Sequence, residues 1–304
     1  LDRALDEETT YYSALSGVLD AVKYGVTTII DHHASNAFVK GSLDTIKEAF
    51  EEVGIQGVLS YELSDREGEA VFQQQLEENL RFYEDNKDAP LTRGMMGLHA
   101  NFTLSSPSLQ TIREAKPEAM PIHIHCGEGK EDFDFCVQEG FAGPVDRLEQ
   151  FDLLRDSSLL IHCVHVSDGD IRLLHKRQPL VVSNPESNAN NNVGMMDTSR
   201  IKDYIIGTDG MSGNMIGSYR SHFLRRNGAV ENPADKLFRR SGAVVNAIFP
   251  ESGKFQPGHS ADIAVLDYIP ETPIHLENLF FHLILGFGAQ QAYMTVANGR
   301  IVFR

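Results

Sequence analysis

One stretch decides the expected fold of this chain: PIHIHCGE, residues 121–128. Its first part has the apolar content and the length of a buried β-strand, which ends at a turn. Successive side chains of a strand point to opposite faces. Ile122 and Ile124 would therefore pack against helices, whereas His123 and His125 would face the inside of a sheet that curves around them.

Six further β-rich runs lie before and after this stretch, at Val26–Asp31, Ile55–Ser60, Gly94–His99, Leu159–Cys163, Leu180–Ser183 and Tyr204–Asp209. Most are followed by a helical pattern, and strands that alternate with helices indicate a parallel sheet. An open doubly wound sheet would carry a glycine-rich phosphate turn, and the sequence has no G-x-G-x-x-G or P-loop. We therefore predict an α/β fold, a (β/α)8 TIM-like barrel whose first strand is absent from the chain.

The pattern changes near residue 250. Ala261–Asp267 and Tyr293–Phe303 alternate like antiparallel strands, and Asn298-Gly299 is a two-residue hairpin signal. We predict the barrel in residues 1–250 and, in residues 251–304, the C-terminal part of a small β-sandwich domain formed by the two chain ends.

One connection does not fit a regular barrel. A parallel crossover needs about a dozen or more residues, usually helical. Between Ser183 and Tyr204 the sequence offers a cluster of asparagines and no long helical pattern. Either the crossover is irregular or residues are missing from it.

Charge and composition exclude several kinds of partner. The 304 residues include 27 basic and 43 acidic side chains, a net charge of −16 that would repel nucleic acid. The longest apolar stretch, Leu279–Phe287, is shorter than the ~18 residues of a membrane span. Three cysteines form no disulfide framework, so we expect a reduced, cytoplasmic protein. We also expect a homodimer or higher homo-oligomer.

Three strand ends carry groups suited to a metal. In (β/α)8 enzymes the active site lies at the C-terminal ends of the strands. His125, followed by Glu128, ends one run; His162 ends the next; Asp209 ends the last. Two imidazoles and a carboxylate suit Zn²⁺ or Fe²⁺. A lone strand histidine is more often structural, but the three together favour a metal site.

These residues resemble the motifs of the amidohydrolase superfamily. HCGE at 125–128, HCVH at 162–165 and GTDG at 207–210 are similar to its fifth-, sixth- and eighth-strand motifs, in the same order. GVTT at 25–28, SNP at 183–185 and PGHSAD at 257–262 resemble its deaminase and chlorohydrolase-like branch. DHHAS at 31–35, GLH at 97–99 and TLS at 103–105 resemble the SsnA-type aminohydrolases of that branch.

The resemblance implies a metal-dependent hydrolase of C–N bonds other than peptide bonds. His125 would be a metal ligand, and Asp209 a ligand and proton acceptor. Glu128 would contact the substrate and carry a proton to it. His162 would hydrogen-bond the water that the metal activates, or bind a second metal, and His99 would contact the substrate. The implied reaction is hydrolytic deamination of a small heterocyclic amine, with Zn²⁺ favoured over Fe²⁺.

The sequence departs from the family on the first strand, where a His-x-His pair supplies two ligands. No such pair precedes Val26. His32 and His33 cannot replace it, because neighbours on a strand point to opposite faces; one of them faces inward, and either lines the pocket or is structural. His123 and His165 are interpreted as supporting residues.

Several functions therefore stay open. Another leaving group, such as chloride, an alkylamine or a cyclic amide, would use nearly the same barrel chemistry. A metal-free, non-catalytic barrel is the alternative from a different class. A nucleotide-binding enzyme is disfavoured because the sequence has no phosphate loop.

Overall fold

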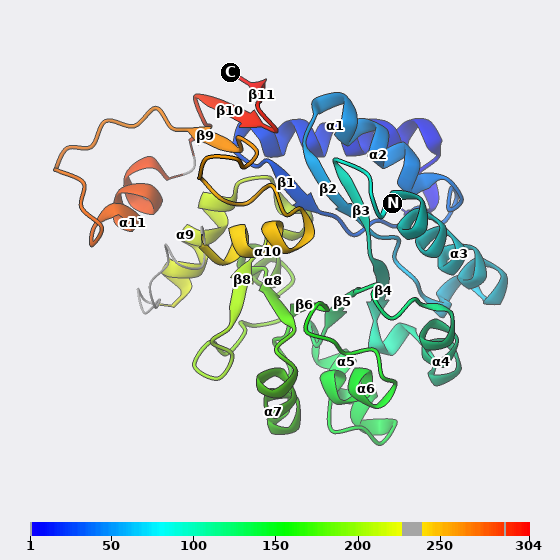
Figure 1. Ribbon diagram of the computed structural model, residues 1–304. Helices are drawn as coiled ribbons and strands as arrows, with labels where there is room; N and C mark the ends of the chain where they lie inside the picture. The colour runs from blue at the N-terminus through cyan, green and yellow to red at the C-terminus, as the bar shows by residue number, and fades with distance from the viewer. Residues whose placement is uncertain (1, 227–238, 289) are drawn as a thin grey trace.

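The computed structural model describes residues 2–226, 239–288 and 290–304. Its centre is a curved parallel sheet in which strands follow one another in chain order, as in a barrel (Figure 1). The strands are β1 (Thr28–Ile30), β2 (Gln56–Leu59), β3 (Thr92–Gly94), β4 (Met96–Ala100), β5 (Ile122–Cys126), β6 (Leu159–His162), β7 (Leu180–Ser183) and β8 (Tyr204–Ile206). All seven predicted runs are strands.

The third predicted run is divided in two at Met95. β3 pairs with β2, whereas β4 pairs with β5, so the wall consists of a three-stranded and a five-stranded sheet. The two sheets stay in contact, because the Met95 N–H donates to the Leu59 carbonyl oxygen at 3.1 Å and Leu63 bridges to Leu98. β1 and β8 form the two edges, and they do not pair with each other in the described chain.

Helices pack around the wall (Figure 1). They are α1 (Glu7–Lys23), α2 (Ser42–Val53), α3 (Glu69–Asn86), α4 (Ser106–Ala115), α5 (Lys130–Gln138), α6 (Pro144–Gln150), α7 (Asp168–Arg177), α8 (Pro185–Asn190), α9 (Met215–Arg225), α10 (Ser241–Ile248) and the short α11 (Leu279–Phe281). Single 3-10 turns lie at Asp2–Ala4, Asp65–Glu67, Asn101–Thr103 and Asp209–Met211, and η6 (His282–Phe287) is a π-helical segment.

The core follows from strand alternation. Ile122 and Ile124 are fully buried in one cluster with the helix residues Leu148 and Leu174, as the sequence predicts. A second cluster lies inside the wall and packs against Phe249, the residue that caps the C-terminal end of α10. Its strand and loop members are Val58, Met95, Leu159, Ile161, Val182 and Ile205. Apolar side chains therefore fill the lower part of the barrel and leave polar groups to the strand ends.

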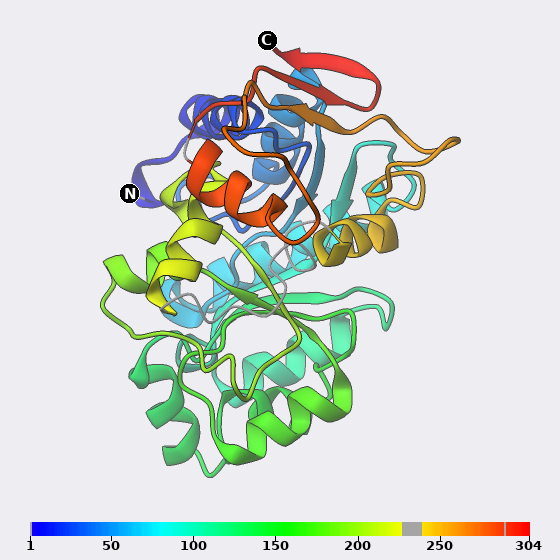
Figure 2. The same cartoon turned by 90° about the vertical axis from the view of Figure 1, so that its left-hand side faces the viewer.

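The predicted C-terminal hairpin is confirmed. β10 (Met294–Ala297) and β11 (Arg300–Phe303) are antiparallel, and β9 (Ile263–Val265) pairs with β10. Asn298 and Gly299 both have left-handed backbone angles, φ 50° and 75°, which a type I′ turn requires. This small sheet lies beside α1 (Figures 1 and 2), where the Thr295 hydroxyl donates to the Val22 carbonyl at 2.6 Å.

The crossover between β7 and β8 is irregular, which was one of the two expectations. It contains only the six-residue helix α8. Residues beyond 250 also reach the barrel, because Leu283 and Ile284 belong to the same buried cluster as Tyr219 of α9. The division of the chain at residue 250 stays a prediction.

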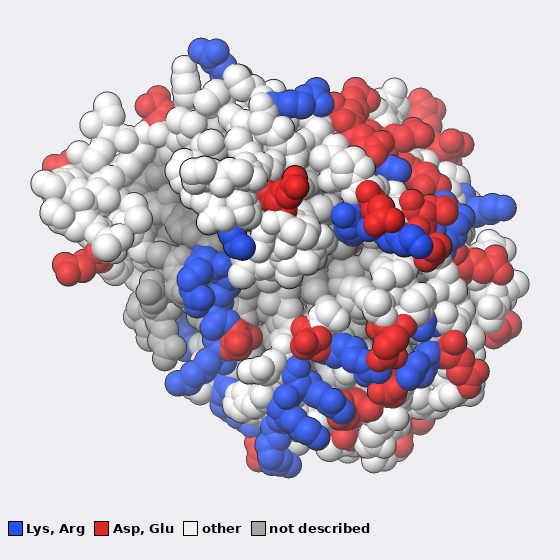
Figure 3. All heavy atoms as spheres, viewed as in Figure 1, with Lys and Arg blue, Asp and Glu red and all other residues white. Residues whose placement is uncertain are grey.

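No helix in the described part of the chain combines the length and apolar character needed to cross a membrane. On the face shown in Figure 3, acidic side chains gather over α1, α2 and α3, while basic and acidic groups alternate below them. Many of the basic groups are paired, for example Arg81 with Asp44 and Arg155 with Glu118.

Candidate metal and catalytic site

Three of the predicted residues meet at the C-terminal ends of the strands. His162 ends β6, Glu128 follows β5, and Asp209 follows β8. The His162 Nε2 atom lies 3.5 Å from Glu128 Oε2 and 3.7 Å from Asp209 Oδ2. One nitrogen and two carboxylate oxygens thus lie within 4.8 Å of one another, an arrangement that could hold a metal ion. The His125 ring centroid is 5.6 Å from that of His162.

Local backbone turns direct these side chains. His162, Cys163 and Asp209 have left-handed backbone angles, with φ of 74°, 46° and 55°. Gly127, with φ of 59°, lets the chain turn between His125 and Glu128. A Cβ atom at residue 127 would lie 2.4 Å from the carbonyl oxygen of His165, so only glycine fits there.

The proton on His162 is fixed by a neighbour. Its Nδ1 lies 2.7 Å from Asn188 Oδ1, an amide oxygen that can only accept a hydrogen bond. Nδ1 therefore carries the proton, and Nε2 presents a lone pair toward Glu128 and Asp209. Nε2 is buried and has no hydrogen-bond partner among the described residues. A buried acceptor without a partner is what a metal ligand looks like before the metal is bound.

We expect Asn188→Ala to weaken Zn²⁺ binding by about 10- to 100-fold, the usual cost of losing a group that orients a ligating histidine. Competition with a chromogenic chelator would measure it. Asn190→Ala is the matched control, because Asn190 lies on the same helix, is exposed and bonds only to Asn191 among the contacts described. Equal affinities in the two variants would show that Asn188 does not orient His162.

Asp209 is held as a carboxylate. Burial acts to raise its pKa, but the Ser187 hydroxyl, which donates to Oδ2 at 2.7 Å, and the Gly210 N–H, which donates to Oδ1 at 2.8 Å, outweigh it. The pKa of Asp209 is therefore below its ordinary value. The group stays ionised through the neutral range and can bind a cation or accept a proton.

The irregular crossover supplies the supports of this site. Ser187 and Asn188 lie on α8, and Asn191 is the residue that caps the C-terminal end of this helix. The Asn191 side-chain N–H₂ group donates to Glu128 Oε1 at 3.0 Å. A short polar helix at this position brings three hydrogen-bonding groups over the strand ends, which explains the asparagine cluster in the sequence.

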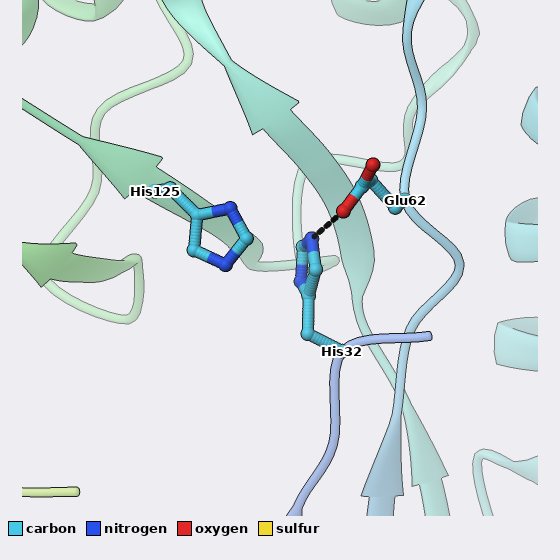
Figure 4. A group of neighbouring side chains, drawn as sticks. All are labelled: His32, Glu62 and His125. Atoms are coloured by element: carbon cyan, nitrogen blue, oxygen red, sulfur yellow. Dashed lines mark ion pairs between the residues drawn. The ribbon is translucent and has the colours of Figure 1, made fainter. Parts of the chain in front are cut away.

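A second group of polar side chains lies on the other side of His125. His32 follows β1 and Glu62 follows β2, and both point toward His125 (Figure 4). His32 Nε2 is 3.7 Å from Glu62 Oε2, and the ring centroids of His32 and His125 are 4.6 Å apart. His99 borders this group, with its Nε2 4.0 Å from Glu62 Oε1.

The histidines around this group are neutral. Burial holds the pKa of His32 well below its ordinary value, and neighbouring imidazoles lower it further. Burial also lowers the pKa of His99 and of His123 to about 3, and it lowers that of His125, with help from His162. Neutral imidazoles keep a lone pair, which is the form that binds metals.

The structure brings Glu128, His162 and Asp209 together, whereas His125 lies beside His162 and belongs to the group of His32 and Glu62. His99 lies next to this second group, near Glu62. His123 lies beneath, against His32, with ring centroids 4.5 Å apart.

His165 lies away from His162, and its Nε2 bonds the Val193 carbonyl at 2.9 Å. The inward member of the adjacent pair is His32, since His33 bonds Ser35. Glu62 was not among the residues predicted from the sequence. It lies three residues beyond the end of β2, and its place after a strand end is the signal that marks it.

Known proteins match this chain over nearly its whole length. The amidohydrolase family model matches residues 1–302. A 5-methylthioadenosine/S-adenosylhomocysteine deaminase of Thermococcus sibiricus is 26% identical over 321 residues, which cover 99% of this chain and 73% of the relative.

Solved structures agree with the fold. An adenosine deaminase from Xanthomonas campestris with bound zinc superposes with a TM-score of 0.83 at 17% identity, covering 99% of this chain and 71% of that one. The E. coli guanine deaminase gives a TM-score of 0.80 at 18% identity, covering 98% and 76%. The predicted barrel fold is therefore confirmed.

Proposed function

The chain belongs to the amidohydrolase family, and on that premise we propose that it is a metal-dependent aminohydrolase that removes ammonia from a small heterocyclic amine. The observation that carries this proposal is the position of His162 Nε2, buried without a hydrogen-bond partner in the described chain and facing the carboxylates of Glu128 and Asp209 at 3.5 and 3.7 Å. Relatives named as deaminases support the same reaction.

The residues present fit a divalent metal. His125, His162 and Asp209 would hold it, and two nitrogens with one carboxylate oxygen favour Zn²⁺ over harder ions, with Fe²⁺ as the second choice. A bound divalent cation supplies a nucleophile at neutral pH, since it lowers the pKa of water from about 15.7 to roughly 7.

The remaining steps belong to side chains. Asp209, ionised and next to His162, accepts the proton of the attacking water and passes it to the departing amine. Glu128 carries the other proton of the water to the ring nitrogen beside the carbon under attack, which makes that carbon a better electrophile and returns Glu128 to its starting form. His162 accepts a hydrogen bond from the water through Nε2 or ligates the metal with it. His99, which lies beside Glu62, would contact the bound ring.

Metal and product analysis test this proposal together. We expect the purified protein to contain a divalent metal, to release ammonia from at least one member of a panel of purine nucleosides, purine bases, pterins and aminotriazines, and to lose this activity on treatment with a chelator. Re-addition of Zn²⁺ should restore it. Chloride or alkylamine as the product would establish a different leaving group. Activity that survives complete removal of the metal would overturn the proposal.

A further inference from the structure

His32 has a feature that the proposed reaction does not use. Its side chain is 10% exposed, and neither ring nitrogen has a hydrogen-bond partner within the described chain. Leaving a buried polar atom without a partner costs about 1–3 kcal/mol. Such a group therefore calls for a ligand that the protein itself does not provide.

Glu62 faces His32, and its two carboxylate oxygens are in different surroundings. Oε1 accepts from the Arg66 guanidinium at 2.6 Å. Oε2 faces His32 Nε2 at 3.7 Å, beyond hydrogen-bond distance. The ion pair with Arg66 therefore orients the carboxylate and leaves Oε2 directed at the imidazole. Carboxylates that bind metals are usually held by an outer partner in this way.

The spacing of these atoms matches a shared cation. Two ligand atoms bound at about 2.0–2.1 Å in a tetrahedral arrangement lie roughly 3.4 Å apart. The 3.7 Å between His32 Nε2 and Glu62 Oε2 is close to this value. A ring nitrogen of His125 is the third ligand atom, and the three atoms lie within 4.8 Å of one another. The three side chains converge from β1, β2 and β5 (Figure 4).

We propose that His32, Glu62 and His125 form a second divalent-cation site, beside the proposed site of His125, His162 and Asp209. Two imidazoles and one carboxylate suit Zn²⁺, Co²⁺ or Fe²⁺, and three protein ligands leave a position open for water. His125 lies between the groups, with its centroid 4.6 Å from that of His32 and 5.6 Å from that of His162. The two sites therefore share one ligand, and each has two of its own.

Co²⁺ titration of the metal-free protein tests this site without reference to catalysis. Asp209→Asn removes a carboxylate from the first group only. In that background we expect one Co²⁺ to bind with visible d–d absorption. Adding Glu62→Gln or His32→Asn should weaken this binding by more than the 10- to 100-fold that loss of an outer partner causes.

The matched control is Glu67→Gln in the same background. Glu67 lies five residues beyond Glu62 and pairs with Arg3 at 2.7 Å. The Glu67→Gln change should leave Co²⁺ binding unchanged, and thermal melting should show that all variants fold. Equal Co²⁺ affinity with and without Glu62→Gln overturns the second site, as does the absence of Co²⁺ binding by Asp209→Asn. Neither result touches the proposed reaction, which ammonia release by the unmodified protein decides separately.

Discussion

Glu128→Gln is expected to slow ammonia release by about 10²- to 10⁴-fold, the usual contribution of a general acid or base. Glutamine keeps the shape of glutamate and can still accept a hydrogen bond from Asn191 through its side-chain oxygen, but it cannot transfer a proton to the ring nitrogen. Glu128 is also absent from the proposed metal ligands. Fold and metal content should therefore stay unchanged, and the loss should appear in kcat, measured by ammonia release under saturating substrate.

Glu139→Gln is the control for this change. Glu139 is the exposed residue that caps the end of α5, the helix that follows Glu128 in the chain. The same chemical replacement there should leave kcat unaltered. If Glu128→Gln kept more than about a third of the activity, Glu128 would not be the proton donor, and another acid would have to be sought beside the substrate.

Asp209→Asn should also cause a large loss, about 10³-fold or more in kcat/KM, because it removes both a proposed metal ligand and the proton acceptor. Asparagine tolerates left-handed backbone angles, so the φ of 55° at this position does not oppose the change. The Ser187 hydroxyl can still donate to the amide oxygen, while the exposed Gly210 N–H loses its side-chain acceptor. The protein should therefore still fold, and its activity should fall because the carboxylate is gone.

Asp203→Asn is the control for this change. Asp203 lies just before β8, at the end of the strand opposite Asp209. Its side chain is 70% exposed and pairs with Arg240. An exposed ion pair contributes about 0–1 kcal/mol to stability, so this variant should melt and react like the unmodified protein. Full activity in Asp209→Asn at saturating Zn²⁺ would remove Asp209 from the mechanism.

Much of the fold could be predicted because its signals are local. The seven apolar runs correspond to strands, because most runs are buried on both faces and apolar residues follow one another within them. The Asn298-Gly299 turn could be predicted for the same reason, since two adjacent residues that tolerate left-handed angles specify it. The break at Met95 could not, because the run shows no local signal for two strands that take different neighbours.

The proposed metal ligands could be predicted because they lie at the ends of strands. His125, His162 and Asp209 could be selected because the parallel arrangement brings all strand ends to one side of a barrel. Asn188 could not be assigned in this way. It lies 26 residues from His162, and only the packing of α8 over the strand ends brings the two side chains together.

The sequence by itself determined the order of the strands, the side of the barrel that carries the chemistry and the family to which the chain belongs. The tertiary structure alone decided that His32 turns inward to meet Glu62, that Arg66 occupies one oxygen of that carboxylate, and that His125 stands between two groups of possible ligands. The physical reason is that a pattern of apolar residues encodes burial along one element. The distances between side chains of different elements are fixed only when those elements pack.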